Sequence, residues 1–200
     1  MPRRLIVCSD GTWNEPEPLD TATNVLKTAR AIRPVDDAGD CQIVFYDCGV
    51  GTSKGSDRVV GGAFGIGLNK NILDAYRFLV HNYLPDDEIY LFGFSRGAYP
   101  VRSLAGLMRN CGLLRKSEAH RIEQAFAHYR SRQPRLHPDS AASVRFRERH
   151  SREVPIRFLG VWDTVGSLGI PLHVFKRFNA RRHSFHDLTL TTLVEHAFHA

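Results

Sequence analysis

The segment that most restricts the fold is a strand-like run that passes directly into a helical pattern. Residues 88–94 are mainly apolar, and apolar side chains recur at helical spacing over residues 95–108. Between them lies Gly93-Phe94-Ser95-Arg96-Gly97. Glycines two residues either side of a serine let strand and helix approach closely while the serine stands on a strained turn. We therefore interpret Ser95 as a nucleophile, with Gly93 and Gly97 shaping its turn; the alternative is a structural turn.

The rest of the chain repeats the alternation of strand and helix. Short apolar runs predict three further strands, at residues 4–8, 42–46 and 155–162. Apolar stripes at helical period predict helices at residues 24–32 and 72–83. This order predicts an α/β fold with a mainly parallel sheet and helices on both faces. Two hundred residues suit a single domain, residues 1–200.

Four other segments carry weaker patterns. The glycines of Gly61–Gly67 do not follow the dinucleotide-binding spacing, so we expect a flexible loop that packs at the start of a helix and lines the site. Residues 117–132 predict a basic amphipathic helix, and residues 133–153 a polar connection. Residues 188–200 predict the beginning of another helix.

Positive charge is concentrated in residues 115–153, which hold ten Lys or Arg against five acids, a net charge of +5. Two interpretations stay open for this segment: a basic lid or cap that faces anionic head groups, or a solvated helical surface. No aromatic interleaving or zinc-finger spacing accompanies the charge, so no nucleic-acid partner is expected.

Cysteine spacing and hydropathy bear on the compartment. The four cysteines (Cys8, Cys41, Cys48 and Cys111) form no CxxC pair or disulfide framework, so we expect buried free thiols. The apolar stretch before Asp10 is too short for a secretory signal. The expected location is the cytoplasm, or export as an effector without a Sec signal.

A serine nucleophile needs a base to take its proton and an acid to orient that base. In sheets with this serine turn the acid and then the histidine follow along the chain. Asp163, at the end of the strand predicted over 155–162, is the best acid, although it could instead cap the following turn. Spacing alone does not choose among the histidines at 173, 183, 186, 196 and 199.

The developing oxyanion needs backbone donors. We expect one from the amide of Arg96 and others from the loop after the first strand, at Gly11, Thr12 and Trp13. An apolar strand ending in Asp-Gly-Thr also opens the haloacid-dehalogenase phosphatases. Their nucleophilic aspartate would stand where this chain has Cys8, so that interpretation fails.

The two histidine pairs also allow a metal-dependent hydrolase. His183 with His186, and His196 with His199, have i, i+3 spacing, and Asp187 could add a third ligand. Neither pair matches a strong zinc signature, so we expect no metal and no cofactor.

Five ordered motifs together resemble the DUF2235 family. They are "DGTWN", "YDCGVGT", "GGAFGIGLNKNILDAYRFL", "DEIYLFGFSRGAY" and "GVWDTVGSLG". DUF2235 is an uncharacterised α/β-hydrolase domain that includes the Tle1-like type VI secretion phospholipase effectors. The resemblance implies an α/β-hydrolase-like fold, Ser95 as nucleophile and Asp163 as acid. It favours His199 as the base over His196, because "AFHA" matches the start of the family's histidine motif. The chain stops before that motif is complete, so we expect it to be truncated.

The expected function is a serine hydrolase that cleaves carboxylic esters, with phospholipid acyl esters as the best single substrate. The expected partners are a lipid or other ester and an anionic membrane surface. A hypothesis from another class is a catalytically incomplete hydrolase fold that binds anionic lipid or a protein. Reactivity of Ser95 toward a phosphonate separates the two, because an unactivated serine does not react.

Overall fold

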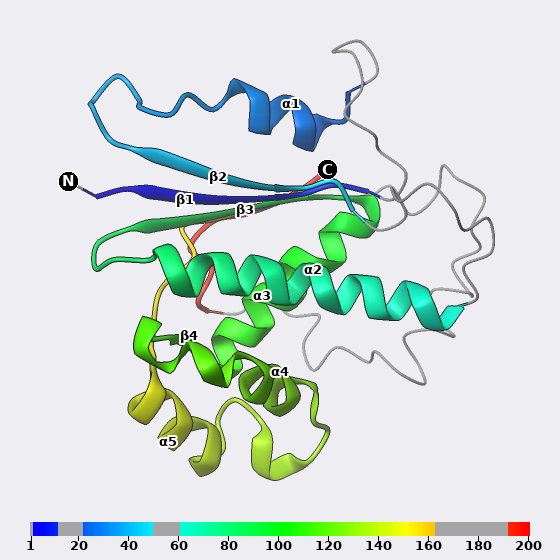
Figure 1. The fold of residues 1–200 in the computed structure, drawn as a ribbon, viewed down its shortest axis with the longest axis vertical. Coiled ribbons are helices and arrows are strands. Elements are labelled where there is room, and N and C mark those ends of the chain that lie inside the picture. Colours follow the sequence, from blue (N-terminus) through cyan, green and yellow to red (C-terminus); the bar gives the residue numbers. More distant parts are fainter. Residues whose placement is uncertain (1, 12–21, 50–60, 163–191) are drawn as a thin grey trace.

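The protein has a central parallel sheet, seen edge-on in Figure 1. The computed structural model describes residues 2–11, 22–49, 61–162 and 192–200, with the backbone alone for residues 61–66. Five strands pair in the order β2-β1-β3-β6-β7, every neighbouring pair parallel. Their bounds are β1 Arg4–Ser9, β2 Gln42–Asp47, β3 Glu88–Phe94, β6 Phe158–Trp162 and β7 Ala197–His199.

Helices cover both faces of this sheet. On one side lies α1 (Asn24–Ala31), and on the other lie α2 (Gly61–Asn82) and α3 (Ala98–Cys111) (Figure 1). A short 3-10 helix, η1 (Ser95–Gly97), joins β3 to α3. Beyond α3 lies a second group of elements, whose first and last members pair as a two-stranded antiparallel sheet. Its members are β4 Leu113–Leu114, η2 Lys116–Arg121, α4 Ile122–Arg130, η3 Pro134–Leu136, α5 Ala141–His150 and β5 Ser151–Arg152.

The alternating side chains of the strands divide the interior into two layers. Leu5, Val7 and Leu91 face α2 and α3 and belong to the larger core. Ile6 and Cys8 face α1 and form the smaller core with Val25. A parallel sheet buried on both faces is the expected architecture, so the α/β fold is confirmed.

The register aligns the carboxyl ends of all five strands. Ser9 pairs with Asp47 on one side and Gly93 on the other, Gly93 pairs with Val161, and Val161 pairs with His199. These five residues form one row across the sheet. The turns that follow the strands therefore emerge at one edge, which is where parallel α/β sheets hold their ligands.

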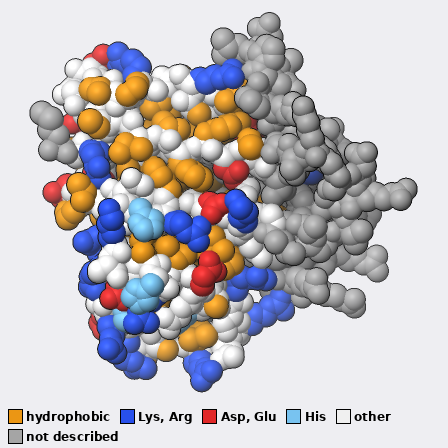
Figure 2. Space-filling view, viewed as in Figure 1, with side chains coloured by type: hydrophobic (Ala, Val, Ile, Leu, Met, Phe, Trp, Pro, Cys, Tyr) orange, Lys and Arg blue, Asp and Glu red, His pale blue; other side chains and the backbone are white. Residues whose placement is uncertain are grey.

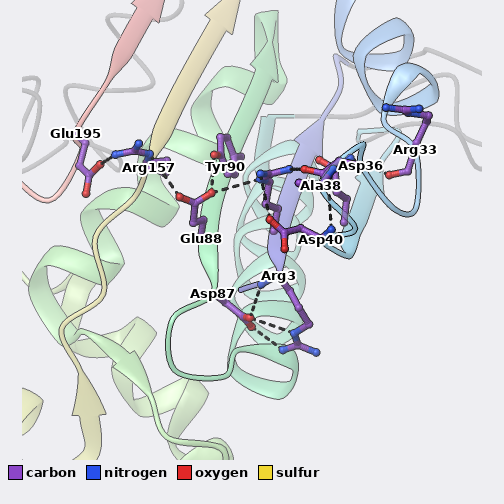
Figure 3. Close-up of polar contacts among 12 residues, drawn as sticks. Arg3, Arg33, Asp36, Ala38, Asp40, Asp87, Glu88, Tyr90, Arg157 and Glu195 are labelled. Carbon is purple, nitrogen blue, oxygen red and sulfur yellow. Dashed lines mark hydrogen bonds and ion pairs between the residues drawn. The ribbon is translucent and has the colours of Figure 1, made fainter. Parts of the chain in front are cut away.

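Ion pairs occupy the opposite, amino-terminal edge (Figure 3). Asp87 is 7% exposed and accepts hydrogen bonds from the backbone and guanidinium of Arg3 and from the amide of Leu84. Burial raises the pKa of this carboxyl, but the Arg3 and backbone bonds outweigh that effect and lower it overall. Arg4 similarly pairs with Asp36 and with Glu88.

Three local predictions are wrong. Residues 61–67 are not a loop but part of the first turns of α2. The polar connection contains the ten-residue helix α5, capped by Ser140, whose hydroxyl accepts the Ser143 N–H at 3.2 Å. Residues 197–199 are the edge strand β7 rather than a helix, because they pair with β6 and Phe198 stacks on Phe158 at 5.5 Å.

The basic segment packs on the end of α3 that is farther from Ser95. Its apolar residues Ile122, Ala125 and Phe126 lie in the larger core. Figure 2 shows Lys and Arg side chains along the lower part of the molecule, where α4 and α5 lie in Figure 1. A lid function for residues 115–153 stays a prediction.

Each of the four cysteines is a thiol, but not all of them are buried as expected. Cys8 and Cys111 are buried, Cys48 is half-buried and Cys41 is exposed. Over the ranges that the structure describes, no helix has the length and apolar character needed to cross a bilayer.

Candidate active site

Ser95 adopts a backbone conformation that few residues with a side chain accept. Its φ is +51°, in the left-handed region, at the point where β3 gives way to η1. A non-glycine residue there costs on the order of 1–3 kcal/mol, so the surrounding packing must enforce it. A strained strand-to-helix turn is also the geometry in which α/β-hydrolase sheets present a nucleophilic serine, the role predicted for Ser95.

Close packing explains why glycines flank this turn. A Cβ on Gly93 would stand 2.6 Å from Val101 Cγ2 and 2.7 Å from the Cα of Ala98. A Cβ on Gly97 would stand 2.2 Å from the carbonyl oxygen of Ser9. The first contact lets α3 approach β3, and the second presses the turn against the end of β1.

The first turn of helix after Ser95 carries the predicted oxyanion donor Arg96. The N-terminal amides of a helix have no intrahelical acceptor and lie at the positive end of its dipole. Arg96 is half-buried, and burial lowers the pKa of its guanidinium.

The loop after β1 begins beside this turn. The Gly11 amide donates to Asp10 Oδ1 at 2.7 Å, so that N–H already has an acceptor in this structure. Thr12 and Trp13, the other predicted donors, lie outside the described residues.

Asp10 is a polar residue at this edge whose importance the sequence interpretation missed. It is 1% exposed and accepts hydroxyl bonds from Thr23 and Tyr46 as well as the Gly11 amide. Burial, followed by the bond to Asp10, raises the pKa of Tyr46. Only the Asp-Gly-Thr pattern at the end of an apolar strand could have pointed to it.

The pKa values of two neighbouring groups are raised, and one of the two groups is thereby unsuited to act as a nucleophile. Burial, with the nearby charge of Asp10, raises the pKa of Cys8 to about 12, so this thiol is protonated at neutral pH. Burial also raises the pKa of Asp47, although the Gly49 amide bonds its Oδ1 and opposes the shift.

His199 ends the edge strand at the same row as Gly93. Because β6 lies between β3 and β7, the backbones of Gly93 and His199 are two strand spacings apart, about 10 Å. The side chain of His199 is exposed, and the Ala200 amide that follows donates to the carbonyl of Val161 at 3.0 Å.

His196 lies three residues earlier, and its carbonyl accepts the Leu159 amide. At about 3.3 Å per residue, it lies about 10 Å farther from the edge that carries Ser95.

The predicted acid cannot be placed in the same way. Asp163 directly follows Trp162, the last residue of β6, but lies outside the described residues. His173, His183, His186 and Asp187 also lie outside them. Where the chain is described, no three His, Cys, Asp or Glu side chains gather as a metal site would require. The structure thus brings the Ser95 turn, Gly11 and His199 to one edge of the sheet.

Comparison with protein families identifies the family of this chain. The model of the family described as "T6SS, Phospholipase effector Tle1-like, catalytic domain" matches residues 3–200. This chain belongs to the Tle1-like family. The printed description of this family is of phospholipase effectors, and the matched part is their catalytic domain.

A curated relative extends the comparison beyond the family description. The chain is 34% identical over 192 residues to "Uncharacterized protein YEL023C" of Saccharomyces cerevisiae. The match covers 84% of this chain but 27% of the relative, so the chain spans about a quarter of that protein. No solved structure matches the Tle1-like domain.

Proposed function

We propose that this Tle1-like domain is a serine hydrolase that cleaves the acyl esters of phospholipids. The observation that carries the proposal is the left-handed φ of Ser95, +51°, on a turn held between Gly93 and Gly97. The family's description as phospholipase effectors supports a lipid ester as substrate. Export as an effector rests on that same description.

In the proposed reaction, the Ser95 hydroxyl attacks the ester carbonyl while His199 takes its proton. The carbonyl oxygen becomes an oxyanion, bound by the amide of Arg96 and by amides of the loop after β1. His199 then returns the proton to the departing alcohol, and water releases the acyl group by the same steps. Asp163 orients the histidine. This pairing of Ser95 with His199 is supported by the register, because β3 and β7 end at the same edge of the sheet.

The test is labelling with a fluorophosphonate, combined with hydrolysis of phosphatidylglycerol vesicles. The wild type is expected to label and to release fatty acid, and Ser95→Ala is expected to lose both activities. Ser103→Ala is the matched control, because Ser103 is a buried serine on α3, eight residues farther along the chain. It should label like the wild type.

Equal labelling of wild type and Ser95→Ala would contradict the assignment of the nucleophile. Labelling without release of fatty acid would retain the serine hydrolase and contradict the phospholipid substrate. An unlabelled wild type that still binds the vesicles would favour a binding fold without catalysis.

A further inference from the structure

We propose that Asp10 is a positioning residue that fixes the backbone at the end of β1 against the Ser95 turn, so that catalysis depends on it. This inference rests on the proposed function and names a further residue that the reaction needs. Asp10 does not act on the substrate itself; its effect passes through the backbone that it holds.

The carboxylate of Asp10 joins three separate elements. Its Oδ1 accepts the Gly11 amide at 2.7 Å, at the end of β1. Its Oδ2 accepts the hydroxyl of Thr23 at 2.6 Å and that of Tyr46, from β2, at 2.8 Å. Burying a carboxylate is costly unless such donors surround it, and hydrogen bonds to a charged acceptor are stronger than neutral ones. The group is therefore a rigid anchor.

Two of these bonds join residues that are twelve positions apart in the sequence, Gly11 and Thr23. Gly11 precedes residues 12–22, and Thr23 follows them. Thr23 also caps α1, since its hydroxyl oxygen accepts the Leu26 amide at 3.0 Å. One carboxylate thus connects the end of β1 to the first turn of α1.

The anchored backbone is in direct contact with the nucleophile turn. A Cβ on Gly97 would stand 2.5 Å from the carbonyl oxygen of Asp10. On the other side, a Cβ on Gly49 would stand 2.4 Å from the carbonyl oxygen of Gly11. Asp10 and Gly11 are therefore held between two glycines, one of them two residues after Ser95.

This geometry gives Asp10 a specific effect on the reaction. Donors that stabilise an oxyanion must be fixed before the charge develops, and removing one lowers kcat by about 10²–10³-fold. The Asp10 backbone packs on Gly97, the residue directly after the candidate donor Arg96, so the anchor holds the turn that presents the Arg96 amide. Loosening the anchor should weaken binding of the transition state and leave binding of the ground state largely unchanged.

The experiment compares wild type, Asp10→Asn and Asp87→Asn on a soluble p-nitrophenyl ester. Asp87 is the matched control, because it is also a buried carboxylate that accepts backbone amides, but at the opposite edge of the sheet. We expect Asp10→Asn to lower kcat by at least about tenfold with KM within about threefold. Asp87→Asn should lower the midpoint of urea unfolding and keep kcat within about twofold of the wild type.

A second measurement reports the tetrahedral adduct directly. When an alkyl trifluoromethyl ketone binds, Ser95 Oγ bonds to the ketone carbon, its proton passes to the base, and the ketone oxygen becomes an oxyanion. The inhibition constant should rise in Asp10→Asn by the factor by which kcat/KM falls. A loss of folding alone would lower the amount of active protein and leave this constant unchanged.

An unchanged or increased kcat in folded Asp10→Asn, with an unchanged inhibition constant, would overturn the inference and leave the proposed function intact. A wild type that neither hydrolyses the ester nor reacts with a phosphonate would overturn both. Should Asp10→Asn fail to fold, Tyr46→Phe decides, since it removes one hydroxyl donor and keeps the ring. A fall in kcat of about threefold or more is then expected, and wild-type kcat would overturn the inference.

Discussion

A methyl group on Gly97 would stand 2.2 Å from the carbonyl oxygen of Ser9, because the turn after β3 packs directly on the end of β1. The atom it would meet belongs to the backbone of a central strand, which cannot rotate away. The turn that carries Ser95 and the end of β1 are therefore fixed relative to each other by a contact that admits no side chain.

Gly97→Ala is accordingly expected to destabilise the fold by about 1–3 kcal/mol or more and to abolish phosphonate labelling. Urea unfolding and labelling measure the two effects. Gly39→Ala is the control: a Cβ there meets nothing within 4 Å, so only its positive φ of +87° carries a cost, about 1–2 kcal/mol. Labelling should survive at Gly39. A stable, labelled Gly97→Ala would show that the contact can relax.

Two substitutions can separate the backbone strain at Ser95 from the loss of its hydroxyl. Ser95→Gly and Ser95→Ala both remove the hydroxyl, but only glycine adopts the left-handed region without cost. Ser95→Gly should unfold with a free energy higher by about 1 kcal/mol than Ser95→Ala. Both should fail to label. Equal unfolding free energies would mean that the turn is not strained.

The edge strand offers a test of the base. His199→Ala should lower kcat by about 10²–10⁴-fold, the usual contribution of a general base. His196→Ala changes the same type of residue on the same segment, about 10 Å farther from the edge that carries Ser95, and should retain wild-type kcat. Steady-state hydrolysis of a soluble ester measures both. The reverse result would assign the base to His196.

The amino-terminal edge predicts a dependence of stability on pH. Burial raises the pKa of Asp87, but the bonds from Arg3 and the backbone lower it overall, below the ordinary aspartate value of 3.8. The folded chain therefore binds this proton more weakly than the unfolded chain. The stabilisation is present above about pH 4 and is lost as the pH falls through the lowered pKa.

Urea unfolding of wild type and Asp87→Asn at pH 6, 4 and 3 tests this. The difference in unfolding free energy should be largest at pH 6 and should shrink below pH 4. A constant difference across this range would contradict the role of the ionised carboxylate.

The positive charge of residues 115–153 predicts an effect on hydrolysis at anionic lipid surfaces. Arg145 and Arg149 are exposed and lie one turn apart on α5. Replacing both by Glu should lower hydrolysis of anionic vesicles and leave hydrolysis of a soluble ester unchanged, because anionic lipid attracts basic residues near its surface. The double variant Lys27→Glu with Arg33→Glu changes net charge equally near α1. Equal losses in the two double variants would attribute the effect to net charge alone.

The sheet and the serine turn could be predicted because their signals are local. Buried parallel strands read as short apolar runs, and Gly93, Ser95 and Gly97 mark the turn by residue type alone. The interpretation missed α5 because its ten residues are polar around most of their circumference, so no apolar stripe reveals the helix. It missed β7 because Leu, Ala and Glu, frequent in this segment, favour a helix locally, whereas pairing with β6 decides the outcome.

The anchoring role of Asp10 could not be predicted for a related reason. Its hydroxyl donors lie 13 and 36 residues away along the chain, on α1's cap and on β2. Only the folded register of β1 with β2 brings Tyr46 to the carboxylate. The sequence predicts the Gly11 amide as an oxyanion donor, and in the structure this amide already donates to Asp10 Oδ1.

The row from Asp47 through Ser9, Gly93 and Val161 to His199 has a consequence for folding kinetics. It joins positions that are far apart in the chain, so none of its pairings forms by local collapse. Chains dominated by such distant contacts fold slowly, since each loop must close before its contacts stabilise anything. During refolding, helix signals should therefore return before Ser95 becomes reactive, and phosphonate labelling would report the completion of the sheet.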